Sequence, residues 1–117
     1  MATNFSKKDM IKLQNLLRKS KKTITTAESC TGGLVASMIT KISGSSDIFN
    51  GSIVTYSNSI KNKELDVLNE SLDKFGAVSK QVVSEMLDGV LRKFEADFAI
   101  AISGIAYELI NSWSNYW

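Results

Sequence analysis

A serine and a lysine are the residues of this sequence best suited to nucleophilic chemistry. Ser29 lies in the run TAESCTGG (residues 26–33), which joins a predicted strand to a predicted helix. A hydroxyl there lies at the carboxyl end of the strand, beside the free backbone amides of a helix N-terminus, which could hold a phosphate or a developing oxyanion. Gly32 and Gly33 let a ligand approach the backbone. The alternative is a capped helix, with Ser29 or Thr31 as N-cap and glycines for tight packing.

Lys61 closes a second strand-to-helix junction, VTYSNSIK (residues 54–61). A lysine in the first turn of a helix meets the positive end of the helix dipole, and burial would further disfavour its charged form. Such a lysine could lose its proton and serve as general base to Ser29. The alternative is a solvated surface lysine. Tyr56 could orient Lys61, donate to a substrate or pack its ring.

A third junction, AISGIA (residues 101–106), follows a continuous apolar run. Ser103 and Gly104 would stand at the carboxyl end of that strand, where α/β sheets bind ligands. The alternative for Ser103 is a polar residue that ends a strand before a glycine turn.

Three further residues have open roles. Glu28 precedes the proposed nucleophile and could pair with Lys61 or cap backbone amides. Asn58 could support the site or, like Ser57, cap the helix that carries Lys61. Cys30 is adjacent to Ser29, but without a histidine partner we interpret it as a small buried residue.

The composition excludes several classes of site. The 117 residues include no histidine, one cysteine and no proline. Ser-His-Asp and Cys-His mechanisms built from this chain are therefore excluded, no intrachain disulfide can form, and we expect neither a metal nor a cofactor. The net charge of +2 argues against direct nucleic-acid binding. Because there is no transmembrane run or signal peptide, we expect a cytoplasmic protein without a membrane partner.

Hydrophobic periodicity predicts the elements that must position these residues. Helical spacing of apolar residues marks an opening helix around Met10–Leu17, a helix over 31–42, a short helix over 58–68 and a long helix from the N-cap Ser79 to Phe94. Strands are predicted over 23–27, 48–56 and 98–102. The basic cluster at residues 18–22 is expected to end the first helix, because cations are favoured there. Alternating strands and helices predict an α/β/α sandwich around a mostly parallel or mixed sheet.

Four segments, in this order and spacing, resemble the CinA C-terminal domain family. They are TAESCTGGLVAS (26–37), GSSDIFNGSIVTYSNSIKNKELDV (44–67), FGAVSKQVVSEM (75–86) and ADFAIAISGIA (96–106). The resemblance covers residues 23–106, and a helix precedes it, as in the family. We therefore expect residues 1–106 to form a domain of this type.

The resemblance implies an amidohydrolase. Family members include nicotinamide-mononucleotide deamidases, which convert the carboxamide to a carboxylate and release ammonia. On this basis Ser29 is the expected nucleophile and Lys61 its base, with Tyr56 nearby. The expected contacts to the nucleotide substrate come from Thr31, Gly32, Gly33, Ser103 and Gly104. Ser103 stands where the family usually has threonine, so the hydroxyl is kept.

The resemblance ends after Ala106. The family continues with a glycine- and proline-rich loop, a strand and a final helix, whereas residues 107–117 form a divergent tail without clear period. By resemblance the loop contacts the phosphate, and a downstream arginine that assists binding has no counterpart here. We expect that a frameshift or early stop replaced this part, so the domain is incomplete. The alternative function is a catalytically impaired paralogue that keeps the fold and weak nucleotide binding.

An incomplete domain would leave part of the sheet uncovered. Bare apolar surface favours association, so we expect a homodimer or larger homo-oligomer. The two tryptophans and Tyr116 of the tail could instead cover that surface.

Overall fold

The computed structural model describes residues 5–105 and 108–114, which form one mixed sheet with helices on both faces. The elements in chain order are α1 (Lys7–Ser20), β1 (Ile24–Glu28), α2 (Leu34–Thr40), the 3₁₀ turn η1 (Ser45–Asp47), β2 (Ile53–Val54), α3 (Asn58–Leu65), α4 (Asn69–Phe75), α5 (Lys80–Phe94), β3 (Phe98–Ile105) and β4 (Glu108–Ser114).

The sheet has the strand order β2-β1-β3-β4. The first three strands are parallel, with Ala27 of β1 opposite Ile53 of β2 and Ala101 of β3. β4 runs antiparallel to β3. The predicted α/β/α sandwich around a mixed sheet is therefore confirmed, and the buried apolar run of residues 98–102 is a central strand.

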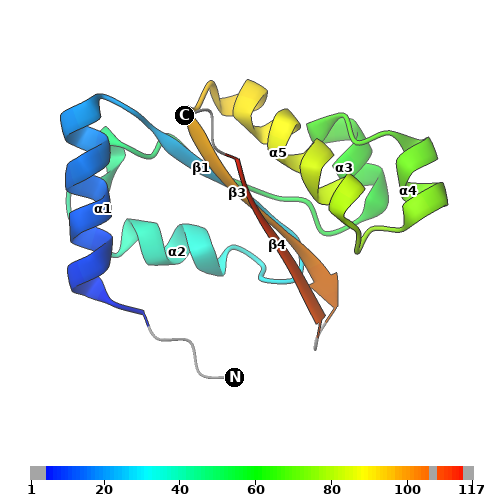
Figure 1. Ribbon diagram of the computed structural model, residues 1–117, viewed down its shortest axis with the longest axis horizontal. Coiled ribbons are helices and arrows are strands. Elements are labelled where there is room, and N and C mark those ends of the chain that lie inside the picture. Colours follow the sequence, from blue (N-terminus) through cyan, green and yellow to red (C-terminus); the bar gives the residue numbers. More distant parts are fainter. Residues whose placement is uncertain (1–4, 106–107, 115–117) are drawn as a thin grey trace.

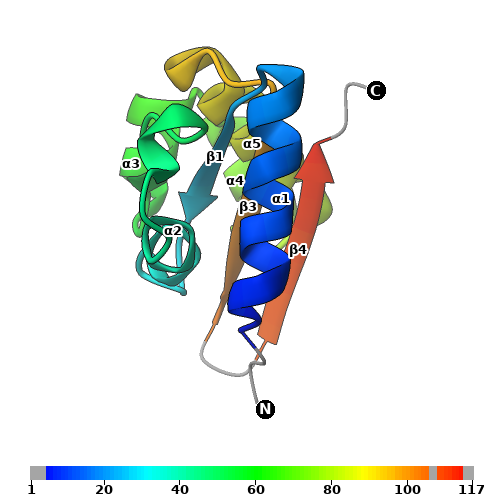
Figure 2. The same ribbon diagram turned by 90° about the vertical axis from the view of Figure 1, so that its left-hand side faces the viewer.

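Two helical layers cover the sheet, as Figure 1 shows. Helices α3, α4 and α5 pack on one face, around a core that includes Leu65, Met86 and Val90 together with Ala27 and Ala101 of the sheet. Helices α1 and α2 lie on the other face, where α1 crosses in front of the strands in Figure 2. Alternation along a strand sends neighbouring residues to opposite layers, so residue parity decides which layer each side chain meets.

Serine hydroxyls begin three of the helices. Ser6, Ser57 and Ser79 each accept a hydrogen bond from the backbone N–H three residues later, at 3.1–3.2 Å. Ser79 was predicted as a cap, and Ser57 rather than Asn58 caps α3. These bonds satisfy amides that a helix start leaves unpaired.

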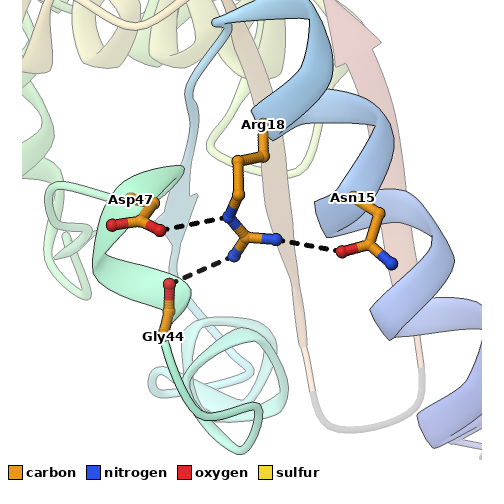
Figure 3. Close-up of polar contacts among 4 residues, drawn as sticks. All are labelled: Asn15, Arg18, Gly44 and Asp47. Carbon is orange, nitrogen blue, oxygen red and sulfur yellow. Dashed lines mark hydrogen bonds and ion pairs between the residues drawn. The ribbon is translucent and has the colours of Figure 1, made fainter.

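Arg18 joins the last turn of α1 to the turn that contains η1. Its guanidinium donates to the Asp47 carboxylate at 3.1 Å, to the Gly44 carbonyl at 3.2 Å and to the Asn15 side chain at 3.0 Å (Figure 3). Arg18 and Lys19 thus occupy the end of α1, where the sequence predicted a basic cluster.

The segment before Lys61 differs from its prediction. A strand was predicted over 48–56, but β2 contains only Ile53 and Val54. Side chains take the place of ladder bonds before it, since Thr25 Oγ1 donates to the Gly51 carbonyl at 2.7 Å and Ser52 Oγ donates to the Thr26 carbonyl at 2.7 Å. Hydroxyls that bond the neighbouring backbone compete with regular pairing in this way.

Three other regions also differ. The helix predicted over 31–42 spans only Leu34–Thr40, and its N-cap is Gly33 rather than Ser29 or Thr31. The predicted helix over 58–68 ends at Leu65, where Asp66 adopts a left-handed conformation, and α4 follows as a separate short helix. Residues 108–114 form β4, although no element was predicted in the tail. Tyr116 and Trp117, expected as cover for bare surface, lie outside the described residues. Within the described chain, no helix is long and apolar enough to cross a membrane.

Candidate active site

The three parallel strands end in a row of buried hydroxyls. The N–H of Thr55 donates to the Glu28 carbonyl at 2.8 Å, and the N–H of Ser29 donates to the Ile102 carbonyl at 3.1 Å. These bonds continue the register of the sheet, so Thr55, Ser29 and Ser103 occupy neighbouring positions at its carboxyl edge. By strand alternation their side chains share the face that carries α3, α4 and α5.

Ser29 and Lys61 meet on this face. Lys61 projects from the first turn of α3, and its Nζ lies 3.3 Å from the Ser29 Oγ. The same Nζ lies 3.4 Å from the backbone carbonyl oxygen of Tyr56. Both side chains are buried, with 5% of Ser29 and 1% of Lys61 exposed. The structure therefore brings together the two residues that the sequence paired as nucleophile and base.

Burial makes the charged form of Lys61 less favourable. Removal of the amine from water lowers the pKa of Lys61 below its ordinary value of 10.5, because the charged form loses its solvation. The neighbouring Cys30 sulfur raises this pKa, as the smaller effect. Among the described residues no carboxylate forms an ion pair with Lys61. A lysine in this environment is poised to accept a proton from a neighbouring hydroxyl.

Glu28 faces the opposite layer and caps backbone amides. Its carboxylate accepts hydrogen bonds from the N–H groups of Val35 and Ala36 in α2, at 3.0 and 2.9 Å. The hydroxyls of Thr31 and Thr26 donate to it at 2.8 and 2.9 Å. Burial by itself would raise the pKa of Glu28, but these four bonds outweigh it and lower the pKa below 4.5. Of the two roles considered for Glu28, pairing with Lys61 is therefore not observed.

The loop after Ser29 turns sharply before α2 begins. Gly32 and Gly33 have φ values of 64° and 104°, a backbone conformation that favours glycine. Within the described chain, the backbone N–H groups of Cys30 and Thr31 have no hydrogen-bond partner. Two N–H donors immediately after a buried serine are suited to an oxyanion. Thr31 itself is tied to Glu28 through its hydroxyl.

Tyr56 and Asn58, near the start of α3, are both exposed. The side chain of Tyr56 is 75% exposed, so its ring does not pack in the core, while its carbonyl holds Lys61. Asn58 is the exposed first residue of α3 and, within the described residues, makes no hydrogen bond to Ser29 or Lys61. The structure thus gives Tyr56 a backbone contact with the pair and gives Asn58 none.

Ser103 is part of the hydroxyl row and anchors a loop. Its Oγ donates to the Ala77 carbonyl at 2.8 Å, which ties β3 to the segment before α5. Only 1% of Ser103 is exposed. Gly104 follows it in β3, opposite Leu109 of β4.

Thr55 belongs to the same row but was not singled out from the sequence. It is completely buried, and its Oγ1 has no hydrogen-bond partner among the described residues. The available signal was its position one residue before Tyr56, at the end of the strand that leads to Lys61. No group of three metal-ligating side chains occurs in the described part of the chain.

Comparison with known proteins identifies the family of this site. The family model of the CinA C-terminal domain matches residues 7–108. A CinA-like protein of Prochlorococcus marinus (strain MIT 9312) is 60% identical over 90 residues, which are 77% of this chain and 21% of that protein. A CinA-like protein of Pseudothermotoga lettingae is 50% identical over 91 residues, 78% of this chain and 22% of that protein. The chain thus spans about a fifth of these relatives.

Solved structures agree. The competence damage-inducible protein A of Klebsiella pneumoniae superposes with a TM-score of 0.82 at 27% identity, over 92% of this chain and 80% of that chain. The competence/damage inducible protein CihA of Agrobacterium tumefaciens gives 0.78 at 31% identity, over 98% of this chain and 85% of that chain. With the family match over residues 7–108 and the same fold, this chain belongs to the CinA C-terminal domain family.

Proposed function

We propose that this chain is an amidohydrolase that converts nicotinamide mononucleotide to nicotinate mononucleotide and ammonia, with Ser29 as nucleophile and Lys61 as its base. The observation that carries the proposal is the buried contact of 3.3 Å between the Lys61 Nζ and the Ser29 Oγ. A buried amine of lowered pKa beside a hydroxyl is the requirement for an activated serine in a chain without histidine.

The reaction has two halves. Lys61 takes the hydroxyl proton of Ser29 while the Oγ attacks the carboxamide carbon, and the carbonyl oxygen becomes an oxyanion. Cys30 and Thr31 directly follow Ser29, and we expect their unpaired N–H groups to donate hydrogen bonds to this oxyanion. Lys61 then returns the proton to the departing nitrogen, which leaves as ammonia, and an ester remains on Ser29. A water molecule then gives a proton to Lys61 and attacks the ester carbon; the bond to the Ser29 Oγ breaks, the Oγ takes the proton back from Lys61, and the carboxylate product is released.

The residues proposed to bind the substrate are near the pair in sequence or in the register of the sheet. We expect Gly32 and Gly33, with their positive φ values, to let the nucleotide approach the backbone, and the exposed side chain of Tyr56 to contact it. Ser103, which the β1–β3 register places beside Ser29, and Gly104 are proposed to contact the nucleotide from the neighbouring strand. The names of the competence- and damage-related relatives describe those proteins, and the small charge of this chain supports no DNA-binding role.

Ammonia release from nicotinamide mononucleotide tests the proposal. The purified chain is compared with Ser29→Ala and with Ser84→Ala, a matched change at an exposed serine of α5. We expect Ser29→Ala to lower the rate about a thousandfold or more, since the nucleophile is lost, and Ser84→Ala to leave it unchanged. No release from a folded wild-type chain would reject the amidase and support the catalytically impaired paralogue that binds nucleotide weakly.

The pH dependence provides a second test. Since Lys61 must be neutral to accept the proton, the rate should rise as the pH rises through the folded-state pKa of Lys61, which lies below 10.5. A rate that stays level while Lys61 titrates would contradict its role as base.

A further inference from the structure

Thr55 is the one member of the hydroxyl row whose side chain has no partner among the described residues. Ser29 contacts Lys61, and Ser103 donates to Ala77, whereas the Thr55 Oγ1 makes no hydrogen bond and the residue is completely buried. A buried hydroxyl without a partner costs free energy in a folded protein, so its presence calls for an explanation.

The sheet fixes where this hydroxyl lies. Glu28 is opposite Val54 in the β1–β2 register, and the N–H of Thr55 donates to the Glu28 carbonyl, so the next position along opposes Thr55 to Ser29. Residues opposite one another in a sheet present their side chains to the same face, on adjacent strands about 4.8 Å apart. Thr55 is therefore the neighbour of Ser29 on the face that α3 covers.

The Lys61 amine has one fewer hydrogen-bond acceptor than its ammonium form can use. A protonated lysine has three N–H donors, and among the described residues it finds two acceptors, the Ser29 Oγ and the Tyr56 carbonyl. Thr55 makes no hydrogen bond to Lys61 in this structure, but it lies one strand from Ser29, whose Oγ contacts the amine, and it immediately precedes Tyr56, whose carbonyl also contacts it.

We propose that Thr55 is a positioning residue that accepts the third N–H of the Lys61 ammonium formed when Ser29 gives up its proton. The inference rests on the proposed role of Lys61 as base. In that step the Ser29 O–H bond breaks and the proton adds to the lone pair of Nζ, so the ammonium then has three N–H groups. One faces Ser29 and the substrate nitrogen, one the Tyr56 carbonyl, and the third the Thr55 Oγ1, which holds the amine in place until the proton is transferred.

The other groups around Lys61 do not offer this acceptor. From the loop after β1, the one titratable group that acts on Lys61 is Cys30, whose sulfur is a weak acceptor. α5 presents the apolar side chains of Met86 and Val90 to the core that contains Leu65 of α3. The nearest ion pair of α3, between Glu64 and Lys93, is partly exposed and does not include Lys61.

The test measures the pKa of Lys61 directly. Chains labelled with ¹³C at the lysine ε-carbons are titrated by NMR, and the Lys61 resonance is assigned by its loss in Lys61→Arg. The variants are Thr55→Val, which keeps the shape but removes the acceptor, and Thr55→Ser, which keeps the hydroxyl. Thr25→Val is the matched control, because Thr25 is a buried threonine of the same sheet face whose hydroxyl is bonded to Gly51.

We expect Thr55→Val to lower the pKa of Lys61 by about one unit, a tenfold change in its proton affinity, because the ammonium loses an acceptor. Its melting temperature should stay level or rise, since an unpaired hydroxyl is removed. Thr55→Ser should restore the pKa, and Thr25→Val should leave it unchanged. A Lys61 pKa that is the same in Thr55→Val as in the wild type overturns the proposal.

The same variants separate this inference from the proposed function. A wild-type chain that releases no ammonia while Thr55→Val still shifts the Lys61 pKa would reject the amidase and retain the Thr55 contact. If the wild-type chain releases ammonia and the Lys61 pKa is unchanged in Thr55→Val, the amidase is supported and the Thr55 contact is rejected.

Discussion

The two faces of the sheet are packed to different degrees. The face under α3, α4 and α5, here called the closed face, contains side chains without any exposed surface, including Val82, Val83, Met86 and Val90. Helices α3 and α5 approach so closely that Gly89 of α5 lies against the backbone of Leu65. A tightly filled core of this kind resists small displacements.

The face under α1 and α2, here called the open face, is less completely filled. An apolar hollow of about 450 Å³ lies between the two helices and the sheet. It is lined by Met10, Leu13, Ile24, Val35, Met38, Ile39, Ile100 and Ile102. Nearby apolar side chains are left in solvent, with 57% of Leu16 and 50% of Leu34 exposed.

The comparison shows which face of the sheet can hold the side chains of the candidate site at fixed distances. Ser29, Lys61, Thr55 and Ser103 all belong to the closed face, where helix positions are fixed by contact between backbones. The open face contains the side chain of Glu28, which holds the start of α2 and, among the described residues, makes no hydrogen bond to Ser29 or Lys61. A site that depends on a lysine within 3.3 Å of a serine is built on the face that can maintain such a distance.

The largest effect on stability is expected at Gly89. A Cβ in Gly89→Ala would lie 2.8 Å from the Leu65 carbonyl carbon, so α3 must move away from α5 and carry Lys61 with it. We expect a loss of about 3 kcal/mol in unfolding free energy, despite the better helix propensity of alanine, and a fall in amide hydrolysis. Urea unfolding and the ammonia assay measure both.

Gly51→Ala is the control for this prediction. Its Cβ would meet the Phe94 ring at 2.9 Å, and a ring edge can turn aside where a backbone cannot. A loss in Gly89→Ala no larger than in Gly51→Ala would contradict the rigid contact between α3 and α5.

The next effect is expected at Glu28. Glu28→Gln exchanges a carboxylate with four hydrogen bonds for an amide that presents an N–H₂ group to donors, and we expect a loss of about 2 kcal/mol at neutral pH. Because the folded-state pKa of Glu28 lies below 4.5, its contribution is complete above that value. It disappears as the pH falls through the lower folded-state pKa.

Urea unfolding at several pH values would follow this change. The stability difference between the wild type and Glu28→Gln should shrink as the pH is lowered below about 4.5. A difference independent of pH would mean that the charge of Glu28 does not stabilise the fold.

A matched pair of enlarging substitutions compares the faces directly. Val83→Ile adds a methylene to a completely buried residue of the closed face and should cost about 1–2 kcal/mol. Val35→Ile adds the same group beside the apolar hollow and should be neutral or slightly stabilising. Equal losses, measured by thermal unfolding, would show that the open face is as tightly packed as the closed one.

The smallest effect on stability is expected at Leu16. Leu16→Gln changes a half-exposed residue of α1, so the folded chain should lose less than about 0.5 kcal/mol. We propose that the wild type is a homodimer or larger assembly through this open face, and Leu16→Gln should then weaken association. Light scattering at micromolar concentration measures the assembly, and a wild-type monomer would count against it.

The sequence predicted the long elements well because their apolar residues recur with a clear period. The helix that became α5, the central strand β3 and the cap Ser79 all follow from such local signals. The bounds of β2 and the presence of β4 could not be predicted in the same way. The hydroxyls of Thr25 and Ser52 decide where regular pairing begins at β2, and β4 depends on its pairing with β3 rather than on a period of its own.

The sequence predicted which residues form the candidate site better than it predicted the contacts that they make. Ser29 and Lys61 were paired by their positions at two strand-to-helix junctions, and they do lie together. The role of Glu28 was left open. Because neighbouring residues of a strand face opposite layers, a Ser29 side chain that faces Lys61 already implies that the Glu28 side chain faces away from it. Thr55 was missed, because its burial and its hydroxyl without a hydrogen-bond partner are visible only in the folded chain.

The adjacency of Glu28 and Ser29 has a consequence for how this domain can change. Glu28 ends β1 and Ser29 continues its register, so alternation alone sends the two side chains to different layers. Removing one residue from the strand would invert this parity, turning a carboxylate toward the lysine and a hydroxyl toward the amides of α2. We therefore expect a one-residue insertion or deletion in β1 to disrupt the site, whereas amino-acid substitutions in the strand leave this alternation intact.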